Sequence, residues 1–237
     1  MLKTHTLPLG AYQTNTYIVW ADHAKTCAII DPGYEAPTIL SKVRELGLEV
    51  EAVLLTHGHF DHVGAVEEIV AATDCKLWMT ESDWSQFPNP VTAYFYPIAN
   101  CDFCEVNFCE DGEAIHAGGL TFQVISTPGH THGSVCYLCE HVMFSGDTLF
   151  CHSCGRTDLP GGDIRQLKKS LARLARLEKP CFIHGGGIDF HGDLRPLLHM
   201  EAALHGIEDP QKNLRPKKGR RASAEKNRIH RERRIRR

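Results

Sequence analysis

The sequence predicts a mixed α/β (α+β) protein built as a four-layer αββα sandwich, with two β-sheets packed face to face and helices on the outside. Two observations predict this fold. Strand-like and helix-like segments alternate along the chain, and they do so in two similar halves. The chain also has 237 residues and 42% hydrophobic content, which is enough to bury a substantial core, and we expect one domain over residues 1–210.

The first half of the chain reads as strands followed by a helix, a strand and a second helix. Two β-branched runs, TNTYIVW and TCAIID, are bounded by turn signals and predict antiparallel strands. In APTILSKVRELGL the apolar residues recur at helical spacing, which predicts a helix that ends at Gly47. EAVLL is a continuous apolar run of buried-strand length, and VGAVEEIVAA returns to helical periodicity.

The second half repeats this theme with different lengths. GLTFQVIST, SVCYLCE and HVMFSGD predict three strands, and IRQLKKSLARLARL predicts an amphipathic helix. KPCFIH predicts a last strand that ends in a histidine.

Side chains that suit metal binding stand at or just after the ends of four predicted strands. His57 follows EAVLL, His130 follows QVIST, Asp147 follows HVMFSG and His184 follows KPCFI. Strand ends are rigid points from which loops can project groups into one cleft. We therefore expect these four side chains to meet in one site.

The strongest single motif is the heptapeptide T-H-G-H-F-D-H at residues 56–62. Three histidines and a carboxylate are costly to bury without partners, and a metal ion supplies such partners. Imidazole nitrogens and carboxylate oxygens are zinc-type ligands at about 2.0–2.2 Å. Gly58 relieves the backbone where the rings of His57 and His59 must converge. A His-rich surface turn is the alternative for the heptapeptide alone, but the other strand-end ligands argue against it.

These segments resemble the metallo-β-lactamase superfamily and, within it, the short glyoxalase II-like hydrolases. The resemblance covers about residues 5–200 and is carried by PLGAYQTNTYIV, AIIDPG, LLTHGHFDHVGA, TPGHTHGS, FSGDTLF and GRTDLPGGD. It implies a metallo-β-lactamase-like sandwich with a binuclear metal centre. By the resemblance, the first metal site is formed by His57, His59 and His130, the second by Asp61, His62 and His184, and the bridging ligand is Asp147.

The chemistry implied is hydrolysis of an activated acyl bond, most simply a thioester of the hydroxyacylglutathione type. Two zinc ions, or iron or manganese in their place, lie about 3.5–4 Å apart in such centres and lower the pKa of a bridging water towards neutrality. A metal also polarises the substrate carbonyl and holds its oxyanion. We expect Asp61 to act both as a ligand and in proton transfer.

Three further residues near the expected site are candidates for supporting roles. Thr148 and His132 are candidates to orient the ligands, although His132 also fits an ordinary polar loop histidine. Arg156, in CGRTD, is a candidate for binding a substrate carboxylate, and a structural pairing with loop carbonyls is equally compatible with the sequence.

The sequence departs from the superfamily pattern in two places. The last histidine of the family commonly sits in Pro-Gly-His-Gly, whereas here His184 follows Phe182-Ile183, and His191 is the substitute ligand if the loop shifts. Full-length glyoxalase II also carries a C-terminal helical domain with much of its glutathione site. This chain has only 26 residues between His184 and its basic tail, which leaves glutathione specificity open.

The chain contains ten cysteines, and no signal peptide precedes them, so we expect reduced thiols. Three C-x-x-C pairs are present: Cys101/Cys104, Cys136/Cys139 and Cys151/Cys154. The middle pair falls on a predicted strand, where positions three apart face opposite sides, so it is poorly placed to chelate. The first pair, with Cys109, fits a structural metal or redox pair, and the last fits a redox-sensitive pair or two ordinary buried thiols.

Charge is unevenly distributed along the chain. Residues 211–237 hold 13 Lys and Arg against 2 Glu, a net charge of +11, which leaves −14 on residues 1–210. Such a tail is typical of a disordered, solubilising extension, and the alternative is contact with a polyanion such as RNA or acidic lipid. The opening MLKTHTLPLG has no apolar h-region and 18 apolar residues never run together, so we expect a soluble, cytoplasmic protein with no membrane contact.

Two other functions remain open at the level of sequence. A persulfide dioxygenase on this fold resembles a site with one iron held by His57, His130 and Asp147. A nucleic-acid processing metallo-hydrolase is suggested by the basic tail, although the added recognition domains of such relatives are not visible here. Metal analysis and substrate tests separate both from the leading interpretation, a small-molecule thioester hydrolase.

Overall fold

The structure is a computed structural model that describes residues 1–87, 104–150, 153–177 and, for the backbone alone, 182–185. The chain divides into two units, Met1–Met200 and Glu201–Arg237. Because the second unit lies outside the described residues, the domain boundary at residue 210 stays a prediction.

The first sheet has six strands in the order β1-β2-β3-β4-β5-β6. The antiparallel strands are β1 (Leu2–Leu9), β2 (Thr14–Ala21) and β3 (Thr26–Ile30). The strands β4 (Glu49–Leu54), β5 (Lys76–Met79) and β6 (Val106–Phe108) then continue the sheet in parallel from β3. Parallel pairing aligns the carboxyl ends of β3 and β4 at one edge of the sheet.

The second sheet has five strands in the order β11-β10-β9-β8-β7. Its strands are β7 (Ala114–Ala117), β8 (Leu120–Ser126), β9 (Val135–Cys139), β10 (Val142–Gly146) and β11 (Phe182–Gly185). All neighbours are antiparallel except β10 and β11, which are parallel. The carboxyl ends of β8 and β10 therefore point the same way, and their loops open at a common edge.

The two sheets pack face to face around one apolar cluster, and alternation along each strand decides which side chains enter it. In β2, Tyr17 and Val19 pack against Phe122 and Phe144 of the second sheet. Ile18, between them, belongs to a second cluster on the opposite face of the first sheet. This period of two is the pattern of strands that are buried on both faces.

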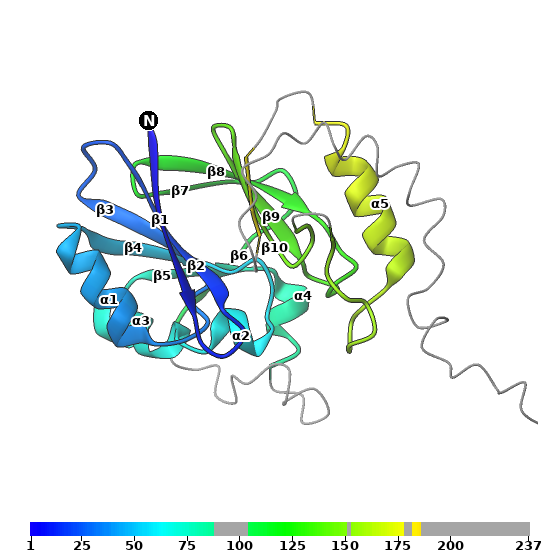
Figure 1. Ribbon diagram of the computed structural model, residues 1–237, viewed down its shortest axis with the longest axis horizontal. Helices are drawn as coiled ribbons and strands as arrows, with labels where there is room; N and C mark the ends of the chain where they lie inside the picture. The colour runs from blue at the N-terminus through cyan, green and yellow to red at the C-terminus, as the bar shows by residue number, and fades with distance from the viewer. Residues whose placement is uncertain (88–103, 151–152, 178–181, 186–237) are drawn as a thin grey trace, which may run out of the picture. The chain divides into compact units, whose positions relative to one another are not determined.

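Helices cover the outer faces of both sheets (Figure 1). On the first sheet, α1 (Ala36–Glu45) and α3 (Val66–Thr73) bury Ile39, Val43 and Ile69 against the sheet. On the second, α5 (Ile164–Leu174) is capped by Asp163, whose carboxylate accepts hydrogen bonds from two backbone N–H groups of the first turn. Two short helices, α2 (Phe60–Val63) and α4 (Glu81–Trp84), lie next to the strand ends. This arrangement confirms the predicted four-layer sandwich.

Several boundaries differ from the sequence-based expectations for local reasons. The helix expected in VGAVEEIVAA is α3, which begins three residues later, at Val66, and the short helix α2 from Phe60, within the histidine motif, was not expected. The helix expected over residues 164–177 ends at Leu174. Strand β1 was not expected, because LKTHTLPL is a half-exposed edge strand containing Pro8 and lacks a continuous apolar face.

The middle cysteine pair confirms the alternation argument. Cys139 belongs to the cluster between the sheets. Cys136 lies on the other face, where its Sγ is 3.5 Å from Thr127 Oγ1. The first and last pairs are only partly within the described residues, since Cys101 and Cys151 lie outside them. Across the described part of the chain, no helix has the length and apolar character needed to cross a membrane.

Candidate metal centre

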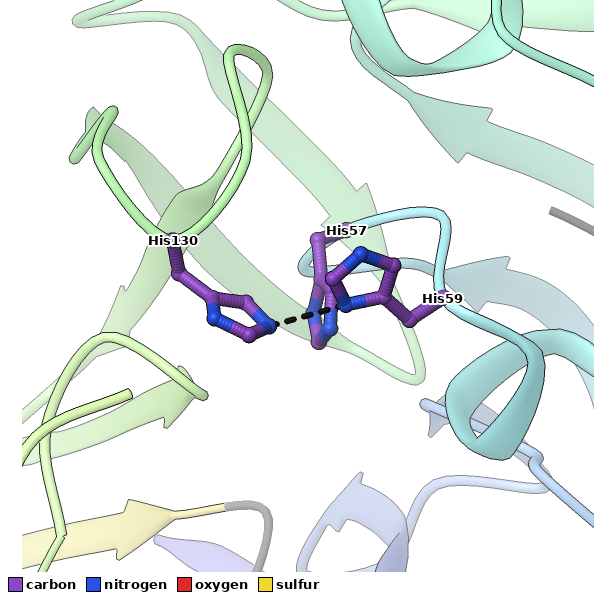
Figure 2. Close-up of side chains that lie close together, drawn as sticks. All are labelled: His57, His59 and His130. Carbon is purple, nitrogen blue, oxygen red and sulfur yellow. Dashed lines mark hydrogen bonds between the residues drawn. The ribbon is translucent and has the colours of Figure 1, made fainter. Parts of the chain in front are cut away.

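Strand ends from both sheets bring the predicted ligands together. His57 and His59 lie in the turn between β4 and α2, and His130 lies in the loop between β8 and β9. Asp147 follows the last residue of β10. Figure 2 shows the rings of the three histidines converging from these two loops.

The three histidines form a compact group of nitrogen ligands. One ligand atom from each of His57, His59 and His130 lies within 4.8 Å of the others, and all three side chains are buried. The closest pair is His59 Nδ1 and His130 Nε2, 2.9 Å apart (Figure 2). Two nitrogens bound to one tetrahedral zinc at about 2.0–2.1 Å are about 3.3 Å apart, so only a small shift separates this arrangement from a filled site.

Hydrogen bonds fix the tautomers of two of these rings. The Thr56 hydroxyl donates to Asp31 Oδ2 at 2.6 Å, so at 3.1 Å it accepts from His57 Nδ1–H. His130 Nδ1–H donates to the carbonyl of Arg156 at 2.7 Å. In both rings the Nε2 lone pair is left facing the centre, which is the state that binds a metal.

The His57 ring provides the test of whether these residues suit a metal. Its Nε2 atom is buried and has no hydrogen-bond partner among the described residues. A buried polar atom without a partner costs roughly 1–3 kcal/mol, and a cation coordinated by Nε2 removes that cost. The donor set of neutral imidazoles next to carboxylates matches the chemistry of zinc-class ions.

The second group of predicted ligands lies directly beside the first. His62 Nε2 is 3.2 Å from Asp147 Oδ1, and His130 Nε2 is 3.5 Å from Asp147 Oδ2. Asp147 thus lies between the histidines of the two expected sites, with one carboxylate oxygen towards each. Asp61 Oδ2 lies 3.8 Å from His62 Nε2 and accepts a hydrogen bond from Thr14 Oγ1 at 3.1 Å.

Asp31 is a functional candidate that the sequence reasoning missed. It follows β3 in a left-handed conformation, and its Oδ1 accepts from the Thr56 backbone N–H at 2.8 Å. Its Oδ2 accepts from His62 Nδ1–H at 2.9 Å, which leaves His62 Nε2 towards the centre. The carboxylate of Asp31 also lies close enough to His57 and His62 to form a second potential metal-binding group. Its position after a strand, in AIIDPG, was the signal that could have identified it.

Electrostatics within the cluster divides the histidines into two kinds. Burial lowers the pKa of His57, and burial with the neighbouring His130 lowers that of His59 to about 3. Burial also opposes a charge on His62, but the carboxylates of Asp31 and Asp147 outweigh it and raise the pKa of that ring. For Asp147, burial would raise the pKa, but His62 outweighs it, so the pKa lies below its ordinary value. In the metal-free protein, His57 and His59 are therefore neutral at physiological pH.

The remaining candidates are placed as follows. The Arg156 guanidinium is 63% exposed and donates to both oxygens of Asp158 at 2.7 Å, so the side chain has a structural partner in its own loop. His132 is exposed. Thr148 is buried, and its Oγ1 lies 2.9 Å from Thr127 Oγ1, which ties the β10 end to the β8 end.

The expected ligand His184 is described only as backbone. It lies in β11 in register with Phe144 of β10, so its strand runs beside the one that leads to Asp147. Its role as a ligand stays a prediction, and His191 lies outside the described residues.

The fold and the site define an αββα protein with clustered histidine and carboxylate side chains at the strand ends of both sheets. A family model described as the metallo-beta-lactamase superfamily matches residues 9–186. The chain therefore belongs to the metallo-β-lactamase superfamily, and this membership indicates a metal-dependent hydrolase.

Individual relatives refine this position. A hydroxyacylglutathione hydrolase of Haemophilus influenzae is 37% identical over 172 residues, covering 70% of this chain and 80% of the relative. A hydroxyacylglutathione hydrolase of Citrobacter koseri is 34% identical over 175 residues, covering 74% of this chain but only 62% of its own length. A solved structure, TTHA1623 in a di-iron-bound form, is 32% identical with a TM-score of 0.68 and covers 87% of this chain and 99% of that one.

Proposed function

We propose that this chain is a binuclear metal-dependent hydrolase that cleaves a small-molecule thioester of the hydroxyacylglutathione type. One observation carries the proposal: the buried Nε2 of His57, without a hydrogen-bond partner among the described residues, faces a cluster of histidines and carboxylates. The relatives named as hydroxyacylglutathione hydrolases support the thioester class.

We propose the ligand sets that the resemblance implies. The first metal is bound by His57, His59 and His130, and Asp147 bridges to the second. The second is bound by Asp61, His62 and His184. The 3.2 Å and 3.5 Å separations of the Asp147 oxygens from His62 and His130 support the bridging role.

When bound, the two metals supply an activated water at neutral pH and a positive site for the carbonyl oxygen of the substrate. The residues of the chain hold these groups in place. Asp31 and the Arg156 carbonyl fix the tautomers of His62 and His130, and Thr14 orients the Asp61 carboxylate. Asp61 is the residue that we assign to proton transfer, because it is partly exposed at the edge of the cluster.

We propose zinc as the native metal, with two ions per chain. Neutral imidazoles and carboxylates suit zinc, and they also suit iron and manganese. Elemental analysis of the purified protein decides among them. One iron per chain, with oxygen consumption on glutathione persulfide, would replace the hydrolase proposal with the dioxygenase alternative.

The activity test uses a panel of thioesters that includes lactoyl-glutathione. We expect turnover that is lost on chelation and restored by added zinc. Asp61→Ala and His130→Ala should each abolish turnover while the fold is retained, because both remove metal chemistry more than core packing. Full activity of either variant would contradict the mechanism.

The wider context of the protein is also proposed. We propose a cytoplasmic location because Cys27, Cys75 and Cys136 are buried free thiols, which suit a reducing compartment. We propose that the basic residues 211–237 contact polyanions. Binding of the full chain to RNA or acidic vesicles should weaken steeply with salt, and deletion of the tail should remove that binding and leave thioester turnover unchanged.

A further inference from the structure

Asp83 is a fully buried carboxylate outside the expected ligand sets. It lies in α4, its exposed fraction is 0%, and no ion pair involves it within the described residues. Its Oδ1 accepts from the Gly133 backbone N–H at 2.8 Å, and its Oδ2 accepts from the Gly58 backbone N–H at 2.9 Å and from Thr131 Oγ1 at 2.8 Å. Burying a carboxylate with only neutral donors is costly, and its position needs a specific explanation.

The three donors belong to the two segments that carry the first metal site. Gly58 lies between His57 and His59, whereas Thr131 and Gly133 directly follow His130. The first segment extends from the six-stranded sheet and the second from the five-stranded sheet. One carboxylate therefore connects the two halves of the histidine cluster, 71 residues apart between His59 and His130.

The loop after His130 is held on both sides of the Gly133 residue. Asp83 Oδ1 accepts a hydrogen bond from the Gly133 N–H, and Thr80 Oγ1 donates a hydrogen bond to the Gly133 carbonyl at 2.8 Å. A Cβ at position 133 would overlap Thr80 Oγ1 and lie 2.6 Å from Asp83 Oδ1, so the backbone approaches α4 as closely as a glycine permits. These contacts fix the position of this loop relative to α4.

We infer that Asp83 is a positioning residue for the first metal site, holding the His57–His59 turn and the His130 loop at the separation that one metal ion requires. The inference rests on the proposed first metal site, but it does not depend on the thioester substrate. Positioning groups behind metal ligands typically contribute 10–100-fold to metal affinity, and this is the effect expected of Asp83. If Asp83 had a purely structural role, its replacement would change the stability of the protein and leave its metal affinity unaltered.

The test is a cobalt(II) titration of chelator-treated protein, in competition with a chromophoric chelator. Asp83→Asn is compared with the parent in a His62→Ala background, which removes a ligand of the second site and reports the first site alone. The amide nitrogen of Asn must face at least one of the groups that donate to the carboxylate, so the variant loses at least one of the three hydrogen bonds with almost no change of volume. We expect 10–100-fold weaker cobalt binding and an altered ligand-field spectrum.

Asp111→Asn is the matched control. It removes a carboxylate that also accepts a backbone N–H, from Ser126, and pairs with Arg173 away from the site. It should bind cobalt like the parent. Thr131→Val removes one of the three groups that donate to Asp83, and it replaces Asp83→Asn in the test if that variant fails to fold. It should weaken cobalt binding several-fold.

The outcomes are distinct. If folded Asp83→Asn binds cobalt within twofold of its parent, or if only Thr131→Val folds and it binds like the parent, the positioning role is wrong. If the wild-type chain binds no cobalt, both this inference and the proposed metal centre fail. Absence of thioester turnover in a protein that binds cobalt would overturn the proposed substrate alone.

Discussion

Replacing Asp31 with Asn tests how far the hydrogen bonds behind the ligands determine the metal centre. Asp31 accepts from Thr56 N–H, from the Thr56 hydroxyl and from His62 Nδ1–H, at 2.8, 2.6 and 2.9 Å. Asn can keep the acceptor for the backbone N–H, but its amide group then faces the other two donors. A lost bond to a charged acceptor costs about 1.5–3 kcal/mol and a lost hydroxyl bond about 1 kcal/mol, so we expect a loss of about 3 kcal/mol.

The same substitution should weaken metal binding at the second site by about 10–100-fold, because His62 loses the partner that fixes its tautomer. Urea unfolding of the chelator-treated protein measures the stability change, and the metal content after dialysis measures the affinity change. Asp158→Asn is the control, because this exposed ion pair with Arg156 contributes about 0–1 kcal/mol. Wild-type stability together with two retained metals in Asp31→Asn would refute the reasoning.

Three further outcomes are expected. Stability of the metal-free protein should be greatest near pH 6.5, the ordinary pKa of histidine. Below that pH the unfolded chain binds more protons than the folded protein, because the pKa values of His57 and His59 are lowered by folding, and the free energy of unfolding falls by up to about 2.7 kcal/mol per pH unit. Above that pH, the stabilisation from the raised pKa of His62 is lost as the pH rises through that pKa. A free energy of unfolding that rises steadily from pH 6.5 to 5 in urea titrations would contradict this. Gly146→Ala should lower the free energy of unfolding by at least about 2 kcal/mol and reduce the metal content, because φ at this position is 46° and the added Cβ would overlap Thr56 Oγ1. A wild-type melting temperature would disprove the close approach. Chelation should lower the thermal midpoint, since metal at 100 times its Kd stabilises by about 2.7 kcal/mol, and an unchanged midpoint in calorimetry would mean that no metal binds the folded state.

The proposed ligands were accessible to sequence reasoning because their signals are local. His57, His59 and His62 fall within one short motif at the end of a buried strand, and His130 and Asp147 follow runs with clear strand character. Asp31 also follows an apolar strand run, but Asp31 and Asp83 are single carboxylates without a neighbouring histidine, so no motif marks them. Their roles come from partners far along the chain, and Asp83 reaches Gly133 over 50 residues.

The edge strand β1 was missed for a different reason. Burial on both faces produces the apolar runs of β3 and β4, whereas β1 is an edge strand with mostly half-buried side chains. Its stability comes from eight paired positions with β2, and a pairing between two strands is not visible in the composition of one of them. Propensity and periodicity therefore do not reveal an edge strand such as β1, whose stability depends on its partner.

Because the proposed ligands come from both sheets, we expect metal binding and sheet packing to be thermodynamically coupled. His57 and His62 extend from the six-stranded sheet, and His130 and Asp147 from the five-stranded sheet. A metal shared between them resists separation of the sheets at the strand ends, where the apolar cluster between the sheets gives way to polar groups. Asp83 joins the same two sheets without a metal, so it preserves the spacing of the ligands in the metal-free state. On this proposal the folded sandwich and the hydrogen bonds of Asp83 hold the cluster in place, so the metal would bind to preorganised side chains.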